Sequence, residues 1–113
     1  MTEDLARRAV ASPHWRWMPG MLVRYGDGKA WYRLTDGDGY GMPFKHVPPN
    51  PRDAWPDLTD PATLGCLLAL VREALDIPYL CTSVSPEGRW WVDGYSLHDT
   101  EAEALIAALE AAP

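Results

Sequence analysis

The feature that most constrains the fold is an apolar helix signal in the middle of the chain. The segment Thr59-Asp60-Pro61 gives it a typical start, an N-cap followed by a proline at the first helical position. The pattern predicts a helix to about residue 75 whose apolar stripe follows the helical period: Leu64, Leu67, Leu68, Val71 and Leu75. Other apolar residues widen the stripe, so we expect this helix to be covered on more than one side. Gly65 interrupts it, and we expect this glycine to allow close approach of a strand or another helix.

Two pairs of short strand signals flank this helix, one pair on each side in the sequence. Each pair surrounds a segment with the turn residues that are typical of a β-hairpin. The predicted strands are residues 21–25 and 30–35 before the helix, and residues 79–84 and 89–95 after it. Whether the two hairpins join into one four-stranded sheet stays open.

Two more helices are predicted at the ends of the chain. Residues 2–11 form the first. Thr100 and Glu103 form a capping box that starts the last helix, whose expected core face is Ala102, Leu105, Ile106 and Leu109. The predicted order is α-ββ-α-ββ-α, an α+β fold in which an antiparallel sheet built from two β-hairpins packs with helices.

The segment between the first hairpin and the central helix is rich in proline. Residues 40–56 include five: Pro43, Pro48, Pro49, Pro51 and Pro56. Proline lacks the backbone donor that a helix or a central strand requires, so we expect an irregular Pro-rich connection that is either mobile or a contact surface. The chain has 113 residues, of which 47% are hydrophobic, and we expect residues 1–113 to form a single domain.

The charge and hydropathy of the sequence limit the kinds of partner that we expect. A formal net charge of −6 argues against direct binding to the phosphates of nucleic acid and makes a basic partner protein easier to accommodate. The longest apolar run, residues 64–71, is far shorter than the roughly 20 residues of a membrane span. The first residues do not resemble a signal peptide. We therefore expect a cytoplasmic protein with no membrane partner.

The sequence contains no recognisable catalytic or metal-binding motif. Asp36, Asp38 and Gly41 resemble the start of a calcium loop, but Val47 stands where that loop needs its last carboxylate, so a turn is favoured. The three histidines, His14, His46 and His98, do not have the spacing of metal ligands, and neither do the two cysteines, Cys66 and Cys81. Each cysteine is interpreted as a small buried hydrophobe. We expect no catalytic residues, no metal and no cofactor.

The six tryptophans exceed average composition. Most of them are expected to fill the core of a small domain. Trp90 and Trp91 are adjacent in a predicted strand and must point to opposite faces, so one of them is a candidate for exposure. An outward tryptophan with Arg16 or Arg89 nearby would be a typical anchor of a protein interface.

Three segments of the sequence resemble segments of other proteins. Residues 16–21 (Arg-Trp-Met-Pro-Gly-Met), residues 58–74 and residues 100–111 resemble a group of small uncharacterised proteins encoded by bacteriophages and prophages of high-GC bacteria. The resemblance implies a genomic setting and carries no activity or site residues. Small phage accessory proteins often act by binding host machinery, and compact acidic defence inhibitors such as anti-CRISPR proteins offer an analogy for this chain.

These observations give a functional hypothesis. The chain is predicted to be a phage-type accessory protein that binds a host protein, most specifically by inhibiting a nucleic-acid-handling defence complex through acidic residues and tryptophan anchors. A self-associating structural or assembly protein of the phage is the alternative, and a small ligand-binding domain is another. The candidate partner-binding residues are Trp15, Trp17, Asp36, Asp38, Asp53, Trp55, Asp57, Glu87, Trp90, Trp91 and Asp93.

Overall fold

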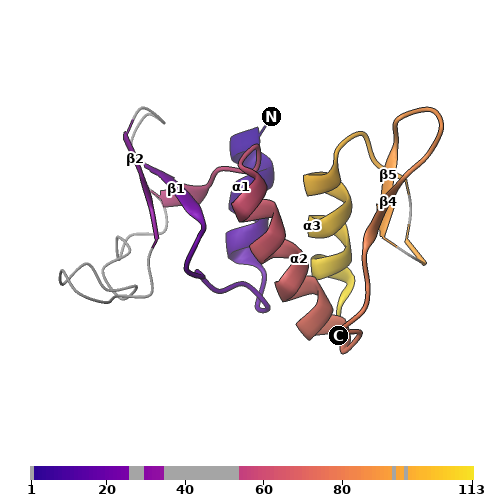
Figure 1. The fold of residues 1–113 in the computed structure, drawn as a ribbon. Helices are drawn as coiled ribbons and strands as arrows, with labels where there is room; N and C mark the ends of the chain where they lie inside the picture. The colour runs from indigo at the N-terminus through magenta and orange to yellow at the C-terminus, as the bar shows by residue number, and fades with distance from the viewer. Residues whose placement is uncertain (1, 26–29, 35–53, 93, 96) are drawn as a thin grey trace.

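A computed structural model of the chain describes residues 2–25, 30–34, 54–92, 94–95 and 97–113. In this part of the chain, three helices lie between a three-stranded and a two-stranded antiparallel sheet (Figure 1). The elements, in chain order, are α1 (Thr2–Ala11), β1 (Leu22–Tyr25), β2 (Ala30–Arg33), β3 (Ala54–Pro56), α2 (Pro61–Leu75), β4 (Thr82–Val84), β5 (Trp90–Val92) and α3 (Glu101–Ala111).

The α+β class and the order of helices and hairpins are confirmed. The first sheet has the strand order β2-β1-β3, and the second consists of β4 and β5, so the two hairpins belong to separate sheets. The helices lie between them and share one hydrophobic core cluster with both (Figure 1).

The prediction that the whole connection up to residue 56 is irregular is wrong at its end. Residues 54–56 form β3, which pairs with β1 so that Val23 lies opposite Pro56. A proline is tolerated there because β3 is at the edge of the sheet, and Asp57 supplies the next backbone donor, to the carbonyl oxygen of Leu22 at 2.8 Å. Residues 40–53 of the connection lie outside the described residues.

The central helix α2 begins as the sequence predicts. The Asp60 side chain accepts a hydrogen bond from the backbone N–H of Thr63 at 2.9 Å, which caps the helix. Leu67, Leu70 and Val71 are fully buried, while the remaining stripe residues are partly buried against the core. The expectation for Gly65 is wrong, because a Cβ atom at this exposed position would meet no atom of the described residues within 4 Å.

The last helix α3 lies between α2 and the second sheet. Thr100 Oγ1 accepts the N–H of Glu103 at 3.1 Å, which confirms one half of the predicted capping box. In place of the other half, the Glu103 carboxylate accepts from the Thr100 hydroxyl group at 3.0 Å. The predicted core face is buried in full, together with Ala104 and Ala108. Because α3 contacts α1, α2, β4 and β5, it connects the second hairpin to the rest of the core.

A buried threonine joins the first sheet to α2. The backbone N–H of Leu22 donates to Thr63 Oγ1 at 2.8 Å, and the same hydroxyl group donates to Asp60 Oδ2 at 2.9 Å. Thr63 is 0% exposed, and its bond to Leu22 is buried, whereas its bond to Asp60 is partly buried. One side chain thus satisfies a buried strand amide and helps to fix the helix cap.

Thr63→Val is therefore expected to lower the free energy of unfolding by about 1–3 kcal/mol, because the shape is kept while the Leu22 amide loses its acceptor in the core. Urea denaturation measures the change. Thr63→Ser is the control, since it keeps the hydroxyl group. Amide hydrogen exchange at Leu22 should accelerate in the valine variant and stay slow in the serine variant, and equal exchange in both would contradict the role of this bond.

Candidate functional site

The net charge of the protein is concentrated at its C-terminal end. Residues 76–113 contain seven acidic residues and a single basic one, Arg89, whereas residues 1–75 contain nine acidic and nine basic residues. The last third of the sequence therefore carries the whole formal charge of −6. This third includes β4, β5 and α3.

Exposed apolar side chains are also concentrated there. Four large hydrophobic side chains are exposed in the described part of the chain, and three belong to this third: Tyr79 (84%), Val84 (52%) and Leu97 (43%). The fourth is Trp31 (59%) on β2. An acidic surface with exposed aromatic and aliphatic groups is typical of a protein-binding region.

The β4–β5 hairpin forms an outer layer beyond α3 (Figure 1). Its inner face includes Val92, which is fully buried, and Trp90, which packs against the core. The register places Ser83 opposite Trp91, and cross-strand partners share a face, so both lie on the outer face. The prediction that Trp90 and Trp91 point to opposite faces agrees with this arrangement.

A groove lies on that outer face. Its volume is about 460 Å³, and we call it the hairpin groove; it is lined by Ile77, Tyr79, Leu80, Cys81, Ser83 and Trp91. Apolar and aromatic groups supply most of this lining, and Trp91 is half-buried within it. The hairpin groove therefore combines a half-buried tryptophan with a largely exposed tyrosine.

The expectation that both cysteines are buried is wrong for Cys81, which is exposed at the groove just before β4. The apolar core lies on the other face of this short hairpin, so a small apolar residue here has no core to enter. Cys66 is half-buried, and its thiol lies 3.5 Å from the carbonyl oxygen of Pro19. Burial raises the pKa of this thiol above its ordinary value.

Most of the predicted tryptophan anchors contribute to the core. Trp15 and Trp17 contact each other edge to face, with ring centroids 5.3 Å apart, and both pack against the core cluster. Trp55 is only 7% exposed, and the Arg7 guanidinium lies over its ring at 5.3 Å from the centroid. With Trp90 on the inner face, Trp91 is the predicted tryptophan that lines the outward groove.

The predicted acidic residues are not one continuous surface. Asp57 forms an ion pair with Arg24 at 3.0 Å and accepts hydrogen bonds from Thr59 at 2.9 and 2.6 Å. Burial by itself raises the pKa of the Asp57 carboxyl group, but the hydrogen bonds from Thr59 and Arg24 outweigh it, so the pKa is lowered. Glu87 is exposed in the turn between β4 and β5. Asp36, Asp38, Asp53 and Asp93 lie outside the described residues.

A second ion pair near Asp57 was not predicted. Arg33 donates to both carboxylate oxygens of Asp60 at 2.9 Å, and it also donates to the carbonyl oxygen of Gly20 at 2.7 Å. The hydrogen bonds from Arg33 hold the pKa of the Asp60 carboxyl group well below its usual range. These contacts join strand β2 to the start of α2, so this charged cluster stabilises the fold.

The lowered pKa values of Asp57 and Asp60 predict a pH dependence of stability. Both carboxyl groups stabilise the fold above their unfolded pKa of about 4, and this contribution is lost as the pH falls through their lower folded values. We expect Asp57→Asn/Asp60→Asn to be less stable than wild type at about pH 7 and to lose less stability on going to about pH 2.5. Urea denaturation at both pH values tests this, and parallel losses would contradict it.

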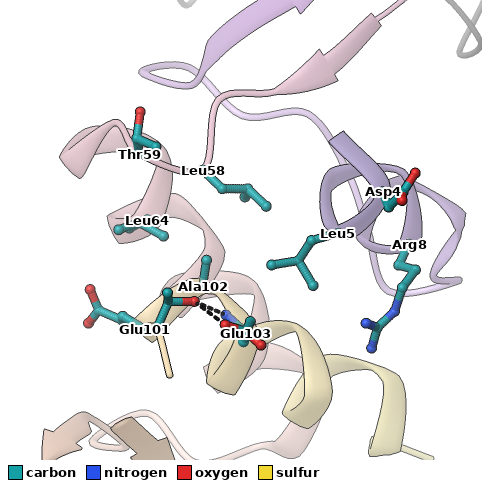
Figure 2. A pocket seen from close by; sticks show the side chains of 10 residues that line it. Asp4, Leu5, Arg8, Leu58, Thr59, Leu64, Glu101, Ala102 and Glu103 are labelled. Carbon is teal, nitrogen blue, oxygen red and sulfur yellow. Dashed lines mark hydrogen bonds between the residues drawn. The ribbon is translucent and has the colours of Figure 1, made fainter. Parts of the chain in front are cut away.

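Another pocket lies between α1, α3 and the start of α2 (Figure 2). Its volume is about 410 Å³, and Leu5, Leu58 and Leu64 are among its apolar lining residues. Four charged residues line it, Asp4, Arg8, Glu101 and Glu103, and the last three already have partners. Arg8 pairs with Glu110 at 2.6 Å, Glu101 accepts from Thr82 Oγ1 at 2.5 Å, and Glu103 accepts from Thr100 Oγ1 at 3.0 Å. The pocket thus lacks the convergent free polar groups that are typical of a small-molecule site.

Comparisons with protein-family models, curated proteins and solved structures found no match. The resemblance to phage and prophage proteins therefore stays a prediction. Within the described residues, no helix combines the length and apolarity needed to cross a membrane. The same residues include no group of three or more His, Cys, Asp or Glu side chains arranged to hold a metal ion.

Tyr79, Cys81 and Val84 were not predicted to be surface residues. Local patterns do not show which face of a short hairpin the core occupies. The unequal charge of the two parts of the chain, readable by counting residues, is the signal that points to this region.

Proposed function

We propose that this protein acts by binding a partner protein through the hairpin groove and the acidic surface around it. In its most specific form, the proposal is that a phage-type accessory protein inhibits a host nucleic-acid-handling defence complex in the host cytoplasm. The observation that carries it is the aromatic groove on the outer face of β4–β5, within the third of the chain that holds all the net negative charge.

The chemistry of this surface favours a basic protein partner. Tyrosine and tryptophan are enriched among the residues that dominate binding energy, and Tyr79 and Trp91 occupy one groove. The surrounding negative charge attracts a positively charged surface and speeds the encounter with it. Proteins that bind nucleic acid hold it in positively charged channels. The surface of such a channel complements the acidic surface of the β4–β5 hairpin.

The contacts of four predicted binding residues support an interface on the second hairpin. Trp55 and Asp57 are held within the fold by Arg7 and Arg24 respectively, which leaves them little part in a contact with another molecule. Glu87 and Trp91 lie on the β4–β5 hairpin, where the exposed apolar side chains gather. We therefore place the proposed interface on this hairpin.

Affinity capture of the tagged protein from host lysate, with and without nuclease, tests the proposal. Recovery of one nucleic-acid-handling complex, undiminished by nuclease, would support it and identify the target. Loss of the partner after nuclease treatment would show that nucleic acid bridges the two proteins. Recovery of only phage structural proteins or of the bait itself would favour the assembly role, and light scattering would then show a closed oligomer instead of a monomer.

A further inference from the structure

We infer that the hairpin groove takes an extended segment of the partner that carries lysine or arginine, and that this segment adds as a strand to the free edge of β4. This inference rests on the proposed function, because it specifies the part of the partner that occupies the same surface. Strand addition of this kind gives affinity through backbone hydrogen bonds and specificity through alternate side chains.

Strand β4 lies at an edge of the second sheet. One edge of β4 pairs with β5, and β5 is covered on its other edge by residue 98, because Trp90 and His98 exchange backbone hydrogen bonds at 2.7 Å. Among the residues that the structure describes, no strand pairs with the other edge of β4. The hairpin is therefore closed on the β5 side and open on the β4 side.

Some backbone groups of β4 point toward this open edge. Since Trp90 uses its N–H and C=O toward His98, its pairing with Val84 is of the type without hydrogen bonds. The N–H and C=O of Val84 then point away from β5, and those of Thr82 do the same, two residues earlier. These two residues present donors and acceptors in the spacing that an added strand requires.

Acidic side chains lie near β4. Glu101 accepts a hydrogen bond from Thr82 Oγ1 at the start of β4, and Glu87 is exposed in the turn that follows the strand. Arg89, the one basic residue of this third of the chain, already lies 3.5 Å from the Asp99 carboxylate. Acidic groups therefore lie near both ends of β4, and a segment with positive charges complements them.

The hairpin groove lies beside β4. A strand added to β4 alternates its side chains between the two faces, so every second residue lies on the side of Ser83 and Trp91. A lysine or arginine there reaches the aromatic rings of Tyr79 and Trp91, which attract cations through their ring faces. The same segment thus uses the open edge, the acidic flanks and the aromatic lining together.

A defined probe tests the inference on the full chain. The probe is a fluorescein-labelled peptide of seven residues that alternates arginine and threonine and is blocked at both ends, and fluorescence anisotropy measures its dissociation constant. One control replaces every arginine by glutamate. The other keeps the side chains and methylates the backbone nitrogens of the threonines, which removes hydrogen-bond donors. We expect the parent peptide to bind and both controls to bind at least about tenfold more weakly.

A variant of the protein, in place of a changed peptide, tests whether the free edge of β4 binds the peptide. Val84→Pro removes the outward N–H of Val84 without removing a hydrogen bond to β5, and Val84→Ala is its control for the loss of the side chain. We expect at least about a tenfold loss of peptide affinity for Val84→Pro relative to Val84→Ala. Circular dichroism checks that both variants fold, and the methylated peptide decides the question if the proline variant does not.

The outcomes separate this inference from the proposed function. Absence of peptide binding, or equal binding of the parent and methylated peptides, would overturn strand addition. Equal binding of the glutamate peptide would overturn the basic partner segment. If the peptide fails but a captured partner still depends on Tyr79 and Trp91, the inference is wrong while the proposed function stands.

Discussion

Tyr79→Ala/Trp91→Ala is expected to bind the captured partner about 100-fold more weakly than wild type. Truncating an aromatic anchor of an interface often costs more than about 1 kcal/mol, and a loss of about 1.4 kcal/mol, or tenfold, for each of the two residues gives about 100-fold. Tyr79 is 84% exposed, so its removal takes little from the core, and Trp91 lies on the face of the hairpin away from the core. Isothermal titration calorimetry with the purified partner measures the loss.

Trp31→Ala is the matched control for this variant. Trp31 is also a largely exposed aromatic residue, at 59%, but it lies on β2 in the other sheet. We expect its removal to change the affinity less than about threefold. The proposal would be contradicted if Trp31→Ala lost as much affinity as the double variant, or if the double variant, with an unchanged melting temperature, bound like wild type.

Leu105→Ala is expected to lower the free energy of unfolding by about 2–5 kcal/mol, because it removes a fully buried side chain and leaves a cavity. Leu105 lies in the middle of α3, the helix that packs against α2 on one side and β5 on the other. The total stability of a small domain is about 5–15 kcal/mol, so this one change removes a large part of it. Thermal and urea denaturation measure the effect.

Leu97→Ala is the control for the core prediction. Leu97 is 43% exposed, and we expect its replacement to change the free energy of unfolding by no more than about 0.5 kcal/mol. A loss of less than about 1 kcal/mol for Leu105→Ala would contradict the central position of α3. Separate unfolding transitions for the second hairpin and the helices would contradict the shared core.

The helices were predictable because their signals are local. Asp60 and Pro61 start α2, and Thr100 and Glu103 start α3, through contacts between residues no more than three positions apart. The buried face of α3 follows from helical periodicity alone. Contacts between residues far apart in the sequence have no such local signal. Strand β3 forms because residues 54–56 pair with β1, which lies about 30 residues earlier in the sequence.

The candidate site was predictable only in part. Strict alternation in a strand separates Trp90 from Trp91 and requires one of them to face outward. Nothing local distinguishes Trp55, which packs within the core, from Trp91, which lines the groove, because the difference depends on the sheet each one joins. The exposure of Tyr79 and Cys81 likewise depends on which face of β4–β5 is covered by α3.

Amide hydrogen exchange of the protein, alone and bound to its captured partner, tests most directly whether the β4–β5 hairpin is the binding surface. We expect partner binding to slow exchange in residues 79–84 and 90–92 and to leave residues 22–25 and 30–33 unchanged. Protection confined to the first sheet, or to the pocket between α1 and α3, with no change in residues 79–92, would contradict the proposed interface.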